Sequence, residues 1–511
     1  MPDDRRPRRP GRTPQRSLQR PAERTRRADP ARLAAYTVLR AVADGAYANL
    51  ELPTVLRERG IGGRDAAFAT ELAYGTTRMH GLYDAVVEAA AARPVADIDP
   101  PVLDTLRLGA HQLLGMRVPE HAAVAETVGL ARQVNGAGAA GFVNAVLRRV
   151  SEADRETWVA RVAPESLDPT QRRAVATSHP AWVVKALRAA LLGHGAATAD
   201  DVDEQLDALL AGDNTPALVS LVARPGLVDP AQLLEVLGDA GRPGDLARTA
   251  VTLLEGDPGR LAAVREGRAA VQDEGSQLLA LALAAAPVDG DRGDGDRADG
   301  DRTDERWLDL CAGPGGKAGL LAALALERGA DLVANEVAPH RADLVRATLA
   351  PATHRARAAG RAGQVSVRVG DGRDVGRDEP ASYDRVLVDA PCTGLGALRR
   401  RPEARWRRQP SDVPALASLQ RELLASAIDA TRPGGVVAYA TCSPHLGETR
   451  FVVDDVTRRR DDVELLDARP LLTDRDGRAL DGTGDGPTAQ LWPHRHGTDG
   501  MFLALLRRTG A

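Results

Sequence analysis

The stretch LDLCAGPGGKAGLLAALA (residues 308–325) joins a short apolar segment to a helical pattern through a glycine-rich turn. Backbone N–H groups of such a turn, and of the helix that follows it, can face the polar part of a ligand. The turn is not a P-loop, because Lys317 is followed by Ala318 rather than Ser or Thr, and its glycines do not fit GxGxxG. A tight strand-to-helix turn without a ligand is the competing interpretation.

Short strand-like segments alternate with amphipathic segments from Trp307 onward: RWLDLCAG, ADLVANE, QVSVRVGDG, YDRVLVDAP and GVVAYATCS. This alternation predicts an α/β domain with a doubly wound, mostly parallel sheet. Glu336 ends the second of these segments and Asp371 follows the third. We expect both acids at the edge of the sheet that carries the glycine turn, where a ribose would find acceptors. The pattern predicts a nucleoside pocket.

Composition places broad limits on the class of protein. The chain has 511 residues, of which 43% are hydrophobic, so it can form two or three packed cores. A formal net charge of −4 does not itself indicate a nucleic-acid-binding protein. No apolar run is long enough to cross a bilayer, and the three cysteines have no zinc-site spacing. We therefore expect a cytoplasmic, monomeric enzyme with no membrane partner and no metal.

Charge and periodicity divide the chain into five parts. An Arg- and Pro-rich tail (1–28) and an Asp- and Gly-rich insert (288–305) are predicted to be disordered. Apolar residues recur at helical spacing over 29–155, which predicts an all-α domain. Residues 160–287 show mixed patterns and are interpreted as a small α/β connector, and 306–511 form the α/β domain described above.

Two cysteine-bearing segments resemble those of a known family. The glycine turn resembles the methyl-donor loop of RNA cytosine-5 methyltransferases, although Gly313 and Ala318 replace the usual Ala and Thr. VDAPCTGLGALRRRPEARWRR (388–408) is similar to the family's D-A-P-C segment along its whole length. GGVVAYATCSPHLGET (434–449) is similar to its T-C-S motif, although the usual E-E-N is here E-T-R. VQDEGSQLLA and LWPHRHGTDGMFLALL also fit.

The helical segments RDAAFATELAYGTTR and GFVNAVLRR resemble the NusB-like RNA-binding domain of the Sun (Fmu) branch, which modifies 16S ribosomal RNA. The resemblance implies a Rossmann-like methyltransferase domain, S-adenosylmethionine as cofactor, and 16S ribosomal RNA as partner. Two alternatives remain: a cytosine-5 methyltransferase acting on transfer RNA or 23S ribosomal RNA, and a NusB-like RNA-binding protein with an inactive methyltransferase domain.

The chemistry of such an enzyme explains the residue types in these segments. Carbon 5 of cytosine is a poor nucleophile, so a thiolate must first add to carbon 6. Charge then builds toward N3, where Asp389 could provide a donor. The residues alone do not rank Cys392 and Cys442, because DNA cytosine-5 enzymes use the Pro-Cys cysteine as nucleophile. The RNA-family resemblance implies that Cys442 attacks and that Cys392 assists release.

The remaining expected site residues fall into two groups. The cofactor is expected to contact Cys311, Ala312, Gly313, Pro314, Gly315, Gly316, Lys317, Glu336, Asp371 and Asp389. RNA is expected to contact Arg399, Arg400, Arg401, Arg405 and Trp406. An arginine run is ordinarily a solvated face, but here it follows an active-site loop and includes a tryptophan on which a base could stack.

Overall fold

The computed structural model describes residues 27–289, 305–358, 360 and 364–510. The predicted basic tail and the predicted Asp- and Gly-rich insert lie outside these residues, except at their edges. The described residues form two compact units. The first contains residues 27–46, 50–76 and 86–155, and the second contains 47–49, 77–85 and everything from 156 onward.

The first unit is all-helical, as the sequence predicted. Its helices, three of which (α3, α4 and α5) extend into the second unit, are α2 (Pro30–Ala43), α3 (Ala48–Glu58), α4 (Gly63–Arg78), α5 (His80–Ala91), α6 (Pro100–Leu114), α7 (Glu120–Val134) and α8 (Ala137–Val150). The start of α2 shows why a helix begins there: Asp29 accepts from the backbone N–H of Arg32, and Pro30 occupies the first turn. Ala34, Ala35 and Val38 are completely buried and form its inner face.

The second unit begins with helices and a small antiparallel sheet. Four helices come first: α9 (Arg155–Val162), α10 (Pro169–Ala176), α11 (Ala181–Gly193) and α12 (Val202–Asp213). The sheet has the order β2-β3-β1-β4. Its strands are β1 (Val219–Ala223), β2 (Gly241–Pro243), β3 (Ala250–Leu253) and β4 (Ala269–Val271), with α13 (Pro230–Leu237) and α14 (Ala262–Arg265) between them. The helices and the strand expected in the connector are present.

The main sheet confirms the predicted doubly wound architecture. Its strands run in the order β10-β12-β9-β8-β5-β6-β7. The five predicted strands are β5 (Arg306–Asp309), β6 (Asp331–Glu336), β7 (Val365–Val369), β8 (Tyr383–Asp389) and β9 (Thr431–Thr441). These five pair in parallel, whereas β12 (Phe502–Arg508) is antiparallel to β9, to β10 (Val463–Leu466) and to β11 (Ala489–Gln490). The chain order reverses between β5 and β8, which is where open α/β sheets bind ligands.

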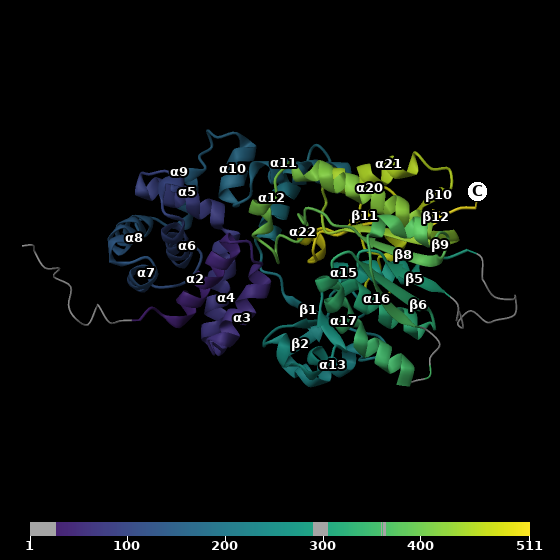
Figure 1. Ribbon diagram of the computed structural model, residues 1–511. Helices are drawn as coiled ribbons and strands as arrows, with labels where there is room; N and C mark the ends of the chain where they lie inside the picture. The colour runs from purple at the N-terminus through teal and green to yellow at the C-terminus, as the bar shows by residue number, and fades with distance from the viewer. Residues whose placement is uncertain (1–26, 290–304, 359, 361–363, 511) are drawn as a thin grey trace, which may run out of the picture. The chain divides into compact units, whose positions relative to one another are not determined.

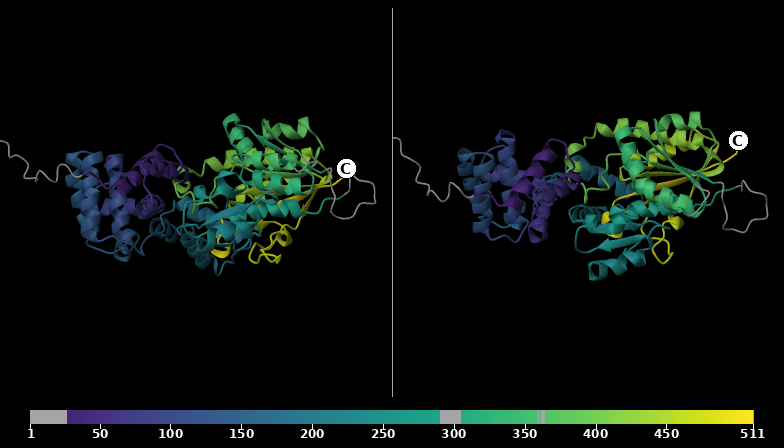
Figure 2. Two further views of the ribbon diagram at one scale, coloured as in Figure 1. Left: turned by 90° about the horizontal axis from the view of Figure 1, so that it is seen from below. Right: turned by 60° about the horizontal axis from the view of Figure 1, so that its bottom comes forward.

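Helices cover both faces of this sheet (Figures 1 and 2). The helices of the domain are α15 (Glu274–Ala285), α16 (Gly316–Glu327), α17 (Pro339–Ala358), α18 (Val375–Asp378), α19 (Ala404–Arg407), α20 (Asp412–Ala430), α21 (Arg450–Thr457) and α22 (Pro493–His496). Trp307 packs in one core with α15 and α16, and the next residue, Leu308, packs in the other core with α20 and α21. This alternation follows from the two-residue period of a strand. Although α15 precedes the expected boundary at 287, it contributes to the core of the sheet.

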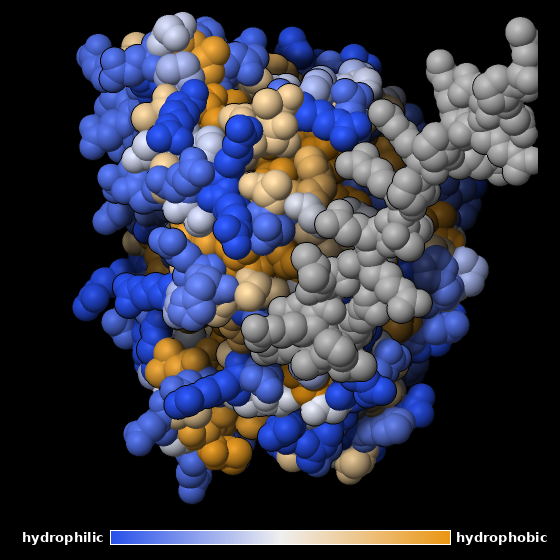
Figure 3. Space-filling view, turned by 90° about the vertical axis from the view of Figure 1, so that its left-hand side faces the viewer, coloured by the Kyte–Doolittle hydropathy of each residue, from blue (hydrophilic) through white to orange (hydrophobic). Residues whose placement is uncertain are grey.

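None of the helices within the described residues is long and apolar enough to cross a membrane. Figure 3 shows a face on which hydrophobic residues lie in separate patches among hydrophilic ones. Scattered apolar patches of this kind are ordinary on a protein surface.

Candidate active site

The glycine turn lies between β5 and α16, at the point where the chain order of the sheet reverses. Gly313 carries the turn close to the end of β6, because its N–H donates to Oε2 of Glu336 across 3.0 Å. A Cβ atom at Gly313 would lie 2.1 Å from that same oxygen. Only glycine allows this approach, so the Ala that is usual in the resembling family would require a local shift here. Cys311 packs against the core behind the turn, and burial raises the pKa of its thiol well above the usual range.

The two acids expected to line a nucleoside pocket are at the carboxyl ends of β6 and β7. Glu336 is 3% exposed, and its Oε1 accepts from the N–H of Ala338 across 3.0 Å. Arg341 lies 3.5 Å from the same carboxylate. Asp371 follows β7 and pairs with Arg373 across 2.6 Å, and this hydrogen bond holds the pKa of Asp371 below its usual range. The expected arrangement at the strand ends is present.

Lys317 and Asp389 meet where β5 and β8 end. Nζ of Lys317 donates to Oδ2 of Asp389 across 2.9 Å, so the first turn of α16 is joined to the end of β8. Burial alone would lower the pKa of Lys317, but the charge of Asp389 and this hydrogen bond outweigh it and raise the pKa. Asp309 lies nearby at the end of β5, where burial, followed by the charge of Asp389, raises its pKa to about 8.

The two cysteines of the predicted mechanism come together. Cys392 follows β8, Cys442 follows β9, and their Sγ atoms are 3.5 Å apart. The contact affects the two thiols in opposite directions. It lowers the pKa of Cys442, helped by the positive charges of Lys317 and Arg401 against the effect of burial. The same contact, reinforced by burial, raises the pKa of Cys392 well above its usual range. The positive charges of Lys317 and Arg401 thus favour the thiolate form of Cys442.

Backbone contacts fix the loop that carries Cys392. The N–H of Gly396 donates to the carbonyl of Cys442 across 2.9 Å, and the N–H of Gly500 donates to the carbonyl of Gly396 across 2.7 Å. A Cβ atom at Gly396 would lie 2.0 Å from the carbonyl oxygen of Gly500. These main-chain contacts join the Cys392 loop to the segments that contain Cys442 and Gly500.

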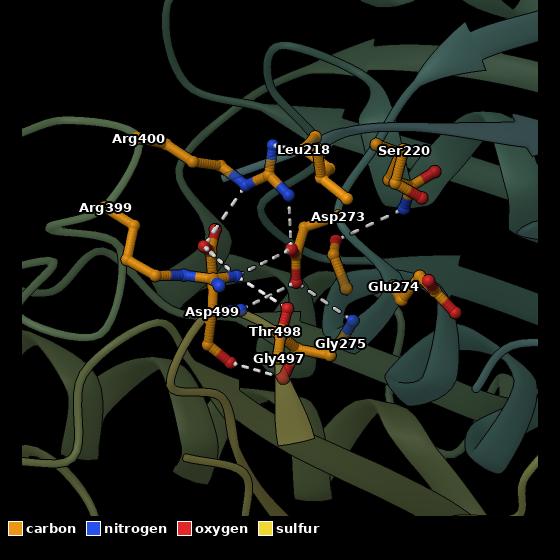
Figure 4. A network of polar contacts seen from close by, with 12 residues as sticks. Leu218, Ser220, Asp273, Glu274, Gly275, Arg399, Arg400, Gly497, Thr498 and Asp499 are labelled. Carbon is orange, nitrogen blue, oxygen red and sulfur yellow. Dashed lines mark hydrogen bonds and ion pairs between the residues drawn. The ribbon is translucent and has the colours of Figure 1, made fainter. Parts of the chain in front are cut away.

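The arginine run does not lie on the surface as a unit. Arg399 is 8% exposed and donates to the carbonyl of Gly497 across 2.8 Å. Arg400 pairs with Asp273 across 2.6 Å and with Asp499 across 3.2 Å. Figure 4 shows both arginines directed at these two aspartates, which come from the start of α15 and from the segment before β12. Arg399 and Arg400 therefore have structural partners within the protein that the sequence did not predict, and their contact with RNA stays a prediction.

Arg405 lies deeper in the protein than Arg399 and Arg400, whereas Arg401 is at the surface. Arg405 is completely buried, and it donates to Oδ1 of Asn214 across 2.9 Å and to the carbonyl of Ser178 across 3.0 Å. The half-buried Trp406 has its ring centroid 5.3 Å from that of His80, a residue of the same compact unit. Arg401 is exposed. Of the expected RNA contacts, only Arg401 has the exposure that a phosphate contact requires.

Sequence reasoning missed two acids of the site. Asp309 belongs to the quoted glycine-turn stretch and could have been noticed as an acid ending a buried strand. Glu448 was noted only as part of a departure from the E-E-N pattern, yet it is completely buried and bonded to both cysteine loops. No local signal in the sequence reveals the role of Glu448, because it depends on a contact with Thr393, which is 55 residues away in the chain.

Comparison with known proteins shows the family to which the chain is related. The family described as 16S rRNA methyltransferase RsmB/F matches residues 300–507, and the NusB family matches residues 29–152. The chain is 53% identical to "Putative methyltransferase Rv1407" of Mycobacterium tuberculosis over 95% of this chain and 98% of that protein. It is 32% identical to ribosomal RNA small subunit methyltransferase B of Pseudomonas putida over 94% of this chain and 99% of that protein.

Solved structures share the fold. The crystal structure of PH0851 superposes with a TM-score of 0.73 at 20% identity, covering 94% of this chain and 99% of that one. A methyltransferase homolog protein from Pyrococcus horikoshii gives a TM-score of 0.50 at 21% identity and covers 67% of this chain and 100% of that one. The doubly wound α/β fold predicted from the alternating pattern, and the Rossmann-like methyltransferase fold implied by the resemblance, are confirmed.

Proposed function

Because the chain belongs to the 16S rRNA methyltransferase RsmB/F family, we propose that it methylates carbon 5 of a cytosine in 16S ribosomal RNA through a covalent cysteine–cytosine intermediate. Membership makes it a methyltransferase that depends on S-adenosylmethionine. The observation that carries the finer proposal is the 3.5 Å contact between the sulfur atoms of Cys392 and Cys442, beside the Lys317–Asp389 pair.

The residues at the switch point fit this cofactor. S-adenosylmethionine, when bound, supplies a methyl group on a positively charged sulfur. Because Gly313 has no side chain, the turn can approach Glu336 closely. The backbone of the turn therefore lies directly beside a buried carboxylate. Carboxylates at the ends of adjacent strands suit both ribose hydroxyls and positive charge. We assign Glu336 and Asp371 to the nucleoside, and the turn at 311–317 to the polar remainder.

The chain's own residues account for the proton and sulfur chemistry. Cys442 is the thiolate that adds to carbon 6, and its lowered pKa favours this form. The electron pair displaced toward N3 is met by a proton from the Lys317–Asp389 pair, whose members share a 2.9 Å hydrogen bond. This addition makes carbon 5 nucleophilic.

Release requires a second group. Once carbon 5 carries its methyl group, its proton must leave before the bond between Cys442 and carbon 6 can break. Cys392 lies 3.5 Å from Cys442, and we assign it to this elimination. The raised pKa of Cys392 keeps it as a thiol during the attack by Cys442, so the two sulfurs do not compete as nucleophiles. Once Cys442 is bonded to carbon 6, its negative charge is gone, so Cys392 can lose its own proton to water. As a thiolate it then takes the proton from carbon 5, and the electron pair left there expels Cys442 as a thiolate while the proton on N3 returns to the Lys317–Asp389 pair.

The test uses the full chain, a tritiated methyl donor and four substrates: naked 16S RNA, small ribosomal particles, 23S RNA and transfer RNA. Bisulfite sequencing of the labelled RNA then locates 5-methylcytosine. Label at one 16S cytosine is expected. Label confined to transfer RNA or 23S RNA would overturn the 16S assignment, and RNA binding without transfer of label would indicate an inactive methyltransferase domain.

A further inference from the structure

The carboxylate of Glu448 is completely buried between the two cysteine loops. It ends a short 3-10 turn, Leu446–Glu448, which follows β9. Its Oε1 accepts from the N–H of Thr393 across 2.7 Å, and its Oε2 accepts from Oγ of Ser443 across 2.7 Å. Oε2 also accepts from the hydroxyl of Thr393. One carboxylate therefore binds both loops at once.

The residues that Glu448 holds are the immediate neighbours of the cysteines. Thr393 follows Cys392, and Ser443 follows Cys442. Oγ1 of Thr393 and Oγ of Ser443 are themselves 3.1 Å apart, so the two hydroxyls and the carboxylate close a small triangle. The triangle lies one residue along the chain from each sulfur, which makes the separation of the sulfurs sensitive to it.

The helix α20 also contacts this triangle of Glu448, Thr393 and Ser443. Nε2 of Gln420, on α20, donates to the carbonyl of Pro391 across 2.8 Å and lies 3.4 Å from Oε1 of Glu448. Pro391 directly precedes Cys392. The Cys392 loop is thus held on both sides of its cysteine, at Pro391 through Gln420 and at Thr393 through Glu448.

Burying a carboxylate is costly unless several donors compensate it. Glu448 receives its donors from the two cysteine loops, whose separation the reaction must control. Among the described residues, neither carboxylate oxygen of Glu448 is a hydrogen-bond partner of Cys392 or Cys442. A group with this arrangement acts through its neighbours.

We propose that Glu448 is a positioning residue for the covalent reaction: by binding Thr393 and Ser443 together, it holds the sulfur atoms of Cys392 and Cys442 in contact. The inference rests on the proposed function, because it assumes that both cysteines take part. It adds a residue that contacts no substrate and yet sets the geometry of attack and release.

Three substitutions test the role. Glu448→Ala removes both acceptors, and Glu448→Asp shortens the side chain by one CH2 so that it reaches only one loop. Glu448→Gln keeps the length, and its amide can donate to a hydroxyl that turns to accept. We expect kcat to fall roughly 10- to 100-fold in the Ala and Asp variants, as for a small misplacement of reacting groups, with KM for RNA and donor affinity unchanged. Gln should restore most of the rate.

A readout that needs no methyl transfer measures the sulfur contact directly. Diamide oxidises two adjacent thiols to a disulfide: an S–S bond forms, and the two thiol hydrogens with two electrons pass to the N=N bond of the reagent. We expect rapid formation of a Cys392–Cys442 disulfide in the wild-type protein, because the sulfurs are 3.5 Å apart. Formation should be slower in Glu448→Ala and close to wild type in Glu448→Gln.

Glu464→Gln is the matched control, because it neutralises an exposed glutamate on β10. Its kcat and disulfide rate should equal those of the wild type. Normal kcat and a normal disulfide rate in both Glu448→Ala and Glu448→Asp, beside an active wild type, would overturn the positioning role alone. A wild type that methylates no cytosine would instead overturn the proposed function, whatever the Glu448 variants do.

Discussion

Lys317 and Asp389 are joined by a 2.9 Å hydrogen bond across the switch point of the sheet, and this pair lies beside the proposed nucleophile. Lys317 is among the groups whose charge lowers the pKa of Cys442. The lysine that ends the glycine turn therefore influences the cysteine that follows β9. The glycine turn and Cys442 are therefore electrostatically coupled.

Lys317→Met should make Cys442 less reactive at neutral pH. Removing the positive charge raises the pKa of the thiol, and each pKa unit lowers its thiolate fraction about tenfold. The pH profile of Cys442 alkylation by iodoacetamide, followed by peptide mass spectrometry, should shift to higher pH. Lys185→Met, at an exposed position of α11, serves as control. Superimposable profiles for Lys317→Met and wild type would show that the charge has no such effect.

The cysteine variants should fail at opposite ends of the covalent cycle. Cys442→Ala cannot attack carbon 6 and should give neither methylated RNA nor a covalent adduct. Cys392→Ala can attack but not release, so it should accumulate a protein–RNA adduct that survives denaturing electrophoresis and is lost in the double variant. An adduct with Cys442→Ala but not with Cys392→Ala would exchange the two roles.

Glu336→Ala should weaken binding of S-adenosylmethionine by about 1.5–3 kcal/mol, roughly 10- to 100-fold, because a charged acceptor is lost. The same substitution frees the N–H of Gly313, so the turn loses an anchor as well. Calorimetric titration measures the affinity. RNA affinity should stay nearly constant, and Asp343→Ala, at an exposed position of α17, should bind the donor normally. Unchanged donor affinity would remove Glu336 from the site.

Arg400→Ala and Arg401→Ala should separate stability from RNA binding. Arg400 pairs with two aspartates, so its loss should lower the free energy of unfolding by roughly 2–4 kcal/mol. Arg401 is exposed, and its loss should change stability by less than about 0.5 kcal/mol. It should instead reduce the slope of log K against log salt by about 0.7–0.9 for a lost phosphate contact. Equal effects of the two substitutions on urea denaturation would contradict this division.

Asp309 should make stability depend on pH. Its pKa is about 8 in the folded protein and 3.8 as the ordinary value. The folded state therefore binds the proton more tightly, and stability is lost as pH rises between these values, by up to about 1.4 kcal/mol per pH unit. Asp309→Asn removes the titration, so the variant should gain stability relative to the wild type from pH 5 to pH 8. If urea denaturation showed that the free energy of unfolding changes with pH in the same way for both proteins over this range, the shift would be contradicted.

Features that depend on local sequence were predictable, whereas contacts between residues far apart in the chain were not. The parallel strands and the placement of Glu336 and Asp371 follow from local alternation, which is why they were predictable. The pairing of Arg400 with Asp273 was not, because the two residues are 127 positions apart in the chain. Glu448 likewise gains its role only where two loops meet. An arginine run after an active-site loop looks the same in the sequence whether its charges meet phosphates or aspartates.

The backbone contact between Gly396 and Gly500 limits how this enzyme could be redesigned. The path from Gly500 to Gly396 to Cys442 consists of main-chain hydrogen bonds, which do not depend on the identity of the neighbouring side chains. Substitution of exposed side chains around the site therefore leaves these main-chain contacts to Cys442 in place. A library that seeks a new RNA target should keep these two glycines fixed and vary the exposed positions, because any side chain at Gly396 would push the loops apart and displace the sulfur itself.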